Sequence, residues 1–380
     1  MYINGRYITY PIRFVETFSA LGGLTSLQFG FSAMRVLFES QGKDIQSYEE
    51  YMKGYYGEAL YQRIFEPFAK KVWGIDPTQL AAETARVRLR GNTIWHALLD
   101  GLFSKQETYI AEFLYPQNGI GEVAQKFTAE IEEKGGSIHY RQEVSQVKGN
   151  EKGIHAVIAK QNGEEVSHPC DVLLNTIPLP QFVKKISPPA SQSVKQSADF
   201  LHFRAIVLVY LLYPKSIAIE DTWLYFPEEH VPFTRVSVPD NFNPNKKNEN
   251  RTCFCVEFTC EVGDETWRAE TETLAEQAHA VLHESGLIDE PYADSLAVRI
   301  EPGYPVYEVG YEEKLEEVLQ HLASFGNVIT AGRQGLFRHN NIDQSIQMGL
   351  LAAEQIMQHP KDFTQWYNLT PQFKDYRIID

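Results

Sequence analysis

Long apolar runs are missing from this chain. The longest, AIVLVYLLYP from Ala205, is about half of the ~20 residues that a membrane-spanning helix needs. We therefore expect a buried strand there and no transmembrane segment. The first residues, MYINGRYITYPIRF, also lack the charged and then apolar pattern of a signal peptide, so a cytoplasmic location is expected.

Cysteine and positive charge are also scarce. The four cysteines, Cys170, Cys253, Cys255 and Cys260, are too few and too scattered for a disulfide framework. Strand alternation in CFCVEFTC places Cys253 and Cys255 on one face and Cys260 on the other, which favours reduced, buried thiols over a metal site. Lys and Arg number 35 against 50 Asp and Glu, and no basic stripe is present, so a nucleic-acid partner is not expected.

What is present is the composition of an ordinary globular protein, with 43% hydrophobic and 22% charged residues over 380 positions. Helical patterns dominate the first third. SYEEYMKGYYGEALYQRIFEPFAKKVWG predicts helix up to a break at Gly74, and DPTQLAAETARVRLRG predicts a second start with Pro77 at the first helical position. Residues 1–114 are therefore interpreted as a helical cap and substrate region.

From Tyr115 onward helices and short strands alternate. We assign residues 115–188 and 321–360 to an α/β nucleotide-binding layer of mixed α/β and α+β character. Residues 189–320, with strands at FRAIVLVYLLY, TWLYF and RTCFCVEFTCEV, are predicted to form an inserted antiparallel-sheet substrate domain. Residues 361–380 are a tail.

One glycine loop, GIGEVA at residues 119–124, matches the pattern of a dinucleotide-binding turn, with Glu143 at the spacing expected of a ribose ligand. That motif needs a strand leading directly into its first glycine. Here YPQN intervenes, and Pro116 cannot donate to a central ladder. A plain turn and helix start is the favoured interpretation.

A second stretch, NVITAGRQGLFRHNNIDQSIQMGLLAAEQI from Asn327, meets the same requirements better. A short buried strand ends at Gly332, and Arg333 follows where a guanidinium could pair with a phosphate or carboxylate. Asn341 or Asp343 is the natural N-cap of the next helix, whose N-terminus would suit an anionic ligand. The alternative is a capped helix after a strand without any ligand. The apolar stripe of this helix is predicted to be Ile346, Leu350, Ala353 and Ile356.

Five segments in order resemble one family over nearly the whole chain. GRQGLFRHNNIDQSIQMGLLAAEQI resembles the C-terminal FAD signature of flavin amine oxidases, protoporphyrinogen oxidases and UDP-galactopyranose mutases. KVWGIDPTQLAAETARVRLRG, FLYPQNGIGEVAQKF with GGSIHYRQEVSQV, CDVLLNTIPL and GYPVYEVGYEEKL resemble the same group. The resemblance implies an FAD/NAD(P)-binding-type layer and FAD as cofactor. Family members begin with a strand–G-x-G-x-x-G–helix unit that this sequence does not show, so an N-terminally incomplete layer is expected.

The resemblance also implies roles for individual residues. Val144 would touch the adenine end through its backbone, and Thr176 would lie beside the flavin nucleotide. Gly332 and Arg333 would face the pyrophosphate and ribityl chain. Asn341, Asp343 and Gln344 would lie at the ribityl and pyrimidine end, where the helix dipole stabilises the negative charge of a reduced flavin.

The implied activity is hydride transfer from a small-molecule substrate to flavin N5, for which no catalytic acid or base is identified. The first alternative is a mutase acting on a nucleotide sugar, which needs a cationic, tyrosine-rich clamp for the diphosphate. Its candidates are Arg235, Arg299, Tyr304, Tyr307 and Tyr311, although strand-edge packing explains these tyrosines equally well. The second alternative is a truncated homologue without flavin or activity. Trp73 is interpreted as a core residue, with capping of the flavin pocket as the alternative, and no metal site is predicted.

Overall fold

The structure is a computed structural model that describes residues 1–3, 5–8, 45–88, 114–243, 250–359, 362–376 and 378. Two compact units make up the chain. Unit 1 comprises Met1–Gly119, Phe203–Val309 and Asp380, and unit 2 comprises Ile120–His202 and Gly310–Ile379. Among the described residues, no helix combines the length and the apolar character that crossing a membrane requires. The mixed α/β and α+β class predicted from the sequence is confirmed.

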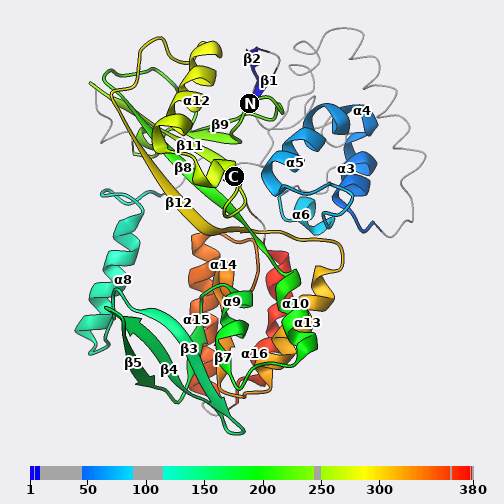
Figure 1. Cartoon of the computed structure of the whole chain (residues 1–380), viewed down its shortest axis with the longest axis vertical. Helices are drawn as coiled ribbons and strands as arrows, with labels where there is room; N and C mark the ends of the chain where they lie inside the picture. The colour runs from blue at the N-terminus through cyan, green and yellow to red at the C-terminus, as the bar shows by residue number, and fades with distance from the viewer. Residues whose placement is uncertain are drawn as a thin grey trace. The chain divides into compact units, whose positions relative to one another are not determined.

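Unit 1 is built on a five-stranded antiparallel sheet of order β12-β8-β11-β10-β9 (Figure 1). Its strands are β8 (Phe203–Tyr213), β9 (Trp223–Tyr225), β10 (Arg235–Ser237), β11 (Thr252–Cys260) and β12 (Asp294–Pro305). The apolar run predicted to be a buried strand is β8, which lies between β11 and β12 and buries most of its residues. Helix α12 (Thr271–Glu284) supplies Leu274, Ala275, Ala278 and Leu282, one apolar stripe, to the same core.

Alternation along β11 gives the cysteine arrangement expected from the sequence. Cys253 and Cys255 are half-buried on one face, and Cys260 is buried on the other. All four cysteines are free thiols. Within the described ranges, no three His, Cys, Asp or Glu side chains gather in a way that could hold a metal ion.

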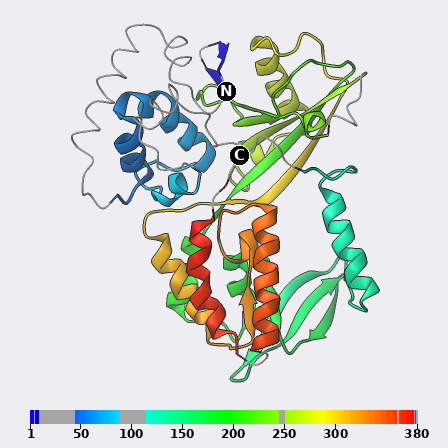
Figure 2. The same ribbon diagram turned by 180° about the vertical axis from the view of Figure 1, so that it is seen from behind.

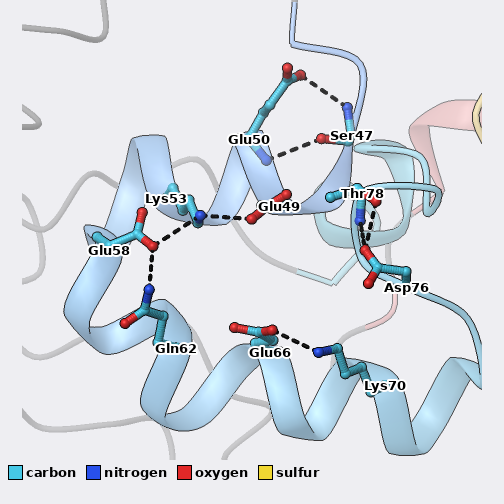
Figure 3. A network of polar contacts seen from close by, with 10 residues as sticks. All are labelled: Ser47, Glu49, Glu50, Lys53, Glu58, Gln62, Glu66, Lys70, Asp76 and Thr78. Carbon is cyan, nitrogen blue, oxygen red and sulfur yellow. Dashed lines mark hydrogen bonds and ion pairs between the residues drawn. The ribbon is translucent and has the colours of Figure 1, made fainter.

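The N-terminal part of unit 1 is helical, and its polar surface is joined by side-chain contacts (Figure 3). Ser47 and Glu50 form a capping box at the start of α3, and Lys53 bridges Glu49 and the Glu58 carboxylate of α4. Gly74 ends α5 in the left-handed conformation, as the sequence predicts. The elements are β1 (Tyr2–Ile3), β2 (Arg6–Tyr7), α3 (Tyr48–Tyr56), α4 (Glu58–Leu60), the π-helical turn η1 (Tyr61–Phe65), α5 (Glu66–Trp73) and α6 (Glu83–Arg86).

The predicted helix start at Pro77 is wrong, because α6 begins only at Glu83. The Asp76 carboxylate accepts hydrogen bonds from the amide and hydroxyl of Thr78, which forms a turn instead. Leu80 and Ala81 then make β-bridges to Glu308 and Ser47. The rest of that predicted helix lies outside the described residues. Unit 1 also contains the 3₁₀ turn η2 (Pro239–Phe242) and α11 (Glu265–Arg268).

Unit 2 contains a four-stranded sheet of order β5-β4-β3-β7. Its strands are β3 (Glu143–Asn150), β4 (Gly153–Gln161), β5 (Glu164–Pro169) and β7 (Ile186–Ser187). Asn162 and Gly163 both have positive φ in the tight turn that joins β4 to β5, which explains this residue pair. Helix α8 (Gly121–Glu133) starts inside the GIGEVA loop, and residues 114–116 before it form no strand. No strand leads into Gly119, so this loop is a turn and helix start, the interpretation that the sequence favours.

The two apolar strands predicted from CDVLLNTIP and NVITA pair in parallel as β6 (Leu173–Asn175) and β13 (Val328–Thr330). Parallel pairing needs a crossover connection, as in the nucleotide-binding layers expected from the sequence. Side chains of α16 bond the outer carbonyls of β13, with Trp366 Nε1 3.0 Å from Thr330 O and the Tyr367 hydroxyl 3.0 Å from Val328 O. The helices of unit 2 are α9 (Leu179–Lys185), α10 (Gln192–Phe200), α13 (Tyr311–Ala323), α14 (Gly332–Gly335), α15 (Ile342–Gln358), α16 (Thr364–Leu369) and the 3₁₀ turn η4 (Thr370–Asp375).

Helix α15, which can be followed from behind in Figure 2, starts where the sequence predicts but buries a different face. Its buried residues are Met348 and Ala352, whereas Leu350 is 63% exposed. The predicted stripe through Leu350 and Ala353 is therefore wrong. Apolar residues occupy most of the circumference of this helix, so a period of 3.6 residues fits more than one stripe.

Candidate functional site

The turn after β13 in unit 2 gathers most of the residues predicted to bind flavin. Gly332 has φ of +79°, and a Cβ built there would meet no atom within 4 Å, so the backbone faces open space. Arg333 turns inward, and its Nε and Nη2 lie 3.1 and 2.6 Å from the carbonyl oxygen of Asn340. These bonds close the loop between α14 and α15. The predicted contact of Arg333 with phosphate stays a prediction.

Close packing joins this turn to the end of β6. A Cβ on Gly335 would lie 2.8 Å from Asn175 O and 3.3 Å from the Cα of Thr176, so only glycine fits. Asn175 Nδ2 donates to Thr330 Oγ1 at 3.0 Å and fixes the two strand ends side by side. The structure thus brings exposed Thr176 next to Gly335, and its contact with a flavin nucleotide stays a prediction.

The start of α15 is capped by its own side chains. The Asn341 side chain accepts from the N3 backbone, and Gln344 Oε1 accepts from the Asn341 amide at 2.9 Å, which makes a capping box. Asp343 is exposed in the first turn, where a carboxylate interacts favourably with the helix dipole. The buried Asn340 Oδ1 just before this helix accepts no hydrogen bond from the described residues. Val144 lies apart from this turn in sequence, on β3, where it is half-buried and paired with Ala159.

In unit 1, two of the predicted substrate residues meet at one buried carboxylate. Arg235 Nη2 on β10 lies 2.6 Å from Glu257 Oε2 on β11. The Tyr304 hydroxyl on β12 lies 3.2 Å from both oxygens of the same carboxylate. Burial alone would lower the pKa of Arg235, but the neighbouring Glu257 carboxylate raises this pKa well above its ordinary value. Arg235 is therefore a permanent cation.

A second guanidinium faces the same tyrosine. The Cζ of Arg88 lies 5.8 Å from the centre of the Tyr304 ring and 5.3 Å from that of Trp73. The Trp73 and Tyr304 rings meet edge to face at 6.2 Å. We call Trp73, Arg88, Arg235, Glu257 and Tyr304 the guanidinium cluster.

The charges and donors of the guanidinium cluster are not fully balanced by its own acceptor. It contains two cations and one carboxylate, so it carries a net positive charge. The Nε atoms of Arg88 and Arg235 are both shielded from solvent and donate to no acceptor in the described part of the chain. A buried donor without an acceptor is unfavourable, and phosphate or carboxylate oxygens would satisfy both guanidinium groups.

The other predicted substrate residues make different contacts. Arg299 is exposed on β12 and donates to the carbonyls of Trp267 and Ala269, where it caps α11. Tyr307 is buried, and its backbone carbonyl accepts from the amide of Ala81. Tyr311 belongs to unit 2, where its hydroxyl lies 3.4 Å from Arg338 Nη1.

Sequence reasoning missed Arg88 and Glu257. A signal existed for Glu257, because it is the one charged residue of TCFCVEFTC, an otherwise uncharged strand, and a buried charge needs a partner. No local signal distinguishes Arg88 from the other arginines of ARVRLRG. Trp73 is a core residue, as interpreted, and it also forms one wall of the cluster.

The sequence of the chain matches a known protein family. The pattern of the family "Flavin containing amine oxidoreductase" matches residues 15–357. The chain therefore belongs to the flavin-containing amine oxidoreductases, a family of enzymes, as the resemblance in the sequence indicates. No curated protein matches the chain by sequence.

Solved structures with the same fold carry several names. A reduced UDP-galactopyranose mutase is 17% identical, with a TM-score of 0.76 over 93% of this chain and 77% of that one. A putative protoporphyrinogen oxidase from Exiguobacterium sp. 255-15 is also 17% identical, with a TM-score of 0.64 over 88% and 72%. An oxidoreductase from Methanosarcina mazei is 12% identical, with a TM-score of 0.54 over 89% and 74%. At these identities the likeness concerns the fold.

Proposed function

We propose that this chain is an FAD-dependent oxidoreductase that removes a hydride from a small-molecule substrate. The observation that carries the proposal is the turn of unit 2. There β13, paired in parallel with β6, continues through Gly332 to the capped start of α15. Membership in a flavin-containing family supports the cofactor class. When bound, the flavin accepts the hydride at N5.

The residues of this turn fit such a cofactor. Open space beside Gly332 allows close approach of a ligand to the backbone, and the buried Asn340 Oδ1 offers an acceptor to a ligand donor. The N-terminus of α15 would hold the polar, electron-rich edge of the flavin through its dipole. Thr176 and Gly332 would line the nucleotide, and the backbone of Val144 would contact its adenine end.

An absorption spectrum of the purified protein tests the proposal. We expect a flavin absorption band at about 450 nm, and mass spectrometry of the released cofactor should give FAD rather than FMN. Reduction by substrate should bleach the band, and an electron acceptor should restore it. If protein reconstituted with FAD shows no bound flavin, the oxidoreductase proposal is wrong and the flavin-free alternative stands.

A second candidate, a flavin-dependent mutase acting on a nucleotide sugar, is favoured by the guanidinium cluster. Two guanidinium groups with unsatisfied donors would suit the two phosphates of a nucleoside diphosphate, and Tyr304 lies next to both, with its hydroxyl near Arg235 and its ring near Arg88. In this reaction the chain would bind and orient the diphosphate while the sugar carbon reacts.

UDP binding and reduction together decide between the two candidates. The mutase predicts UDP-sugar turnover only after dithionite reduction, and UDP binding that Arg235→Gln weakens roughly tenfold or more. Arg299→Gln is the matched control, because this arginine caps α11 away from the cluster. Turnover that requires an electron acceptor, or equal UDP affinity of the Arg235→Gln and Arg299→Gln proteins, would exclude the mutase.

A further inference from the structure

The ammonium of Lys71 on α5 is bound by three backbone carbonyls. Its Nζ lies 2.7 Å from Phe226 O and 3.3 Å from Phe233 O, and it also donates to Glu228 O. All three acceptors belong to the loop that joins β9 to β10. An ammonium has three donors, so the three carbonyls satisfy it completely.

This loop leads directly into the guanidinium cluster. Tyr225 and Arg235, which flank the loop, are paired across the β9–β10 hairpin. Thr234 inside the loop donates from its amide to Glu257 O, 2.9 Å away. Lys71 therefore binds the loop that leads into Arg235. The same loop contacts Glu257, the carboxylate partner of Arg235.

The same lysine lies two residues before Trp73, at the anchored end of α5. The Thr259 hydroxyl donates to Lys71 O at 2.7 Å, and Arg204 Nε donates to Val72 O at 3.2 Å. Gly74 leaves room for that arginine, because a Cβ there would lie 2.5 Å from Arg204 Cζ. The end of α5 is thus fixed on β8 and β11, and Trp73 with it.

Lys71 is half-buried, unlike an ordinary surface lysine. Burial lowers the pKa of Lys71 to about 7, although Glu228 and Glu229 act in the opposite direction, so this position is unfavourable for an ammonium. The adjacent Lys70 points outward and pairs with Glu66 at 2.7 Å, the usual arrangement on a helix surface (Figure 3).

We propose that Lys71 is a positioning residue that sets the spacing between the two arms of the guanidinium cluster, Trp73 with Arg88 on one side and Arg235 on the other. This inference rests on the proposed anion-binding role of the cluster. A fixed spacing between two guanidinium groups selects an anion with two phosphates over one with a single phosphate. Lys71 thereby determines specificity for a diphosphate without touching it.

The test compares binding of inorganic pyrophosphate and inorganic phosphate by calorimetry on the full chain. Wild-type protein should prefer pyrophosphate, and Lys71→Met should weaken pyrophosphate binding roughly tenfold while changing phosphate binding little, so that the preference disappears. Lys71→Arg, which keeps the charge and several donors, should restore part of the preference. Lys70→Met removes the same charge from the same helix and should behave as wild type.

The outcomes separate this inference from the proposal that it rests on. If wild-type protein binds neither pyrophosphate nor UDP, the anion-binding role of the cluster is wrong. If wild-type protein binds pyrophosphate and Lys71→Met keeps the same affinity and preference, only the role of Lys71 is overturned. Should Lys71→Met fail to fold, Lys71→Gln takes its place, because glutamine keeps a polar donor without the charge, and an unchanged pyrophosphate preference in that variant counts against the inference.

Discussion

Gly335 occupies a position where the backbone of another strand leaves no room for a side chain. A Cβ there would approach Asn175 O to 2.8 Å and Thr330 Oγ1 to 3.0 Å. The obstructing oxygen of Asn175 belongs to the backbone, so it cannot rotate away. This contact holds the start of the predicted flavin turn against the end of β6.

Gly335→Ala should therefore lower the free energy of unfolding by about 1–3 kcal/mol, as overpacking in a tight site does. The matched control is Gly349→Ala inside α15, where a Cβ meets nothing within 4 Å. That change should stabilise the protein by about 0.5–1 kcal/mol, because alanine favours a helix interior over glycine. Urea unfolding curves measure both changes, and equal midpoints for the two variants would contradict the steric explanation.

Single residues were predicted from the sequence where their role is local. Gly74 adopts the positive φ that ends α5, and Asn341 caps α15. Gly335 was not singled out, because the atoms that crowd it come from β6, far away in the sequence. Two donors of Arg333 are bonded to a carbonyl of its own loop, and its predicted contact with a phosphate stays a prediction.

At the scale of elements, α12 and β8 are joined by a polar contact inside an apolar interface. Tyr213 OH lies 3.0 Å from His279 Nδ1, and Tyr292 meets the same imidazole edge to face. Burial lowers the pKa of His279, and nearby His283 lowers it further. The neutral imidazole is thus the form that fits between helix and sheet.

This lowered pKa makes the packing of α12 dependent on pH. The unfolded chain takes up the His279 proton near its ordinary pKa of about 6.5, whereas the folded chain does so only at lower pH. Between these values the unfolded state binds more protons, so stability is complete above about pH 6.5 and declines as the pH falls towards the folded pKa.

His279→Gln should flatten the decline in urea midpoint between about pH 7 and pH 5, since glutamine keeps a polar partner for Tyr213 but does not titrate. His230→Gln is the control, because this histidine is largely exposed. An unchanged slope in the His279→Gln protein would show that other groups cause the acid sensitivity.

Helices and strands were predictable where the hydrophobic periodicity agrees with the turn and capping residues at their ends. The strands β8 and β11 and the start of helix α15 were expected at their observed places. The helix start predicted at Pro77 was wrong, because the Asp76 side chain bonds Thr78 and forms a turn in place of the first turn of a helix. The buried face of α15 also could not be predicted from the sequence, because the elements that pack against this helix decide which of its apolar sides is buried.

At the scale of the whole chain, each unit is assembled from segments separated in the sequence. In unit 2 the strands near residues 175 and 330 pair in parallel, and the segment between them supplies all five strands of the antiparallel sheet of unit 1. The chain carries a formal charge of −15, yet its guanidinium cluster is locally positive. Net charge therefore argues against nucleic-acid binding, but it does not exclude a small anionic ligand held by two buried arginines.

The sequence by itself determined the order of the secondary structure, the capped helix after β13 and the membership in a flavin-containing family, because these depend on residues close together along the chain. Only the tertiary structure decided that Arg88 lies over the rings of Trp73 and Tyr304, that Glu257 binds Arg235, and that Lys71 holds the loop before β10. Those contacts join α5, the chain beyond α6 and three strands. Their energy comes from burial and pairing across the fold, which no periodicity or motif within one segment can encode.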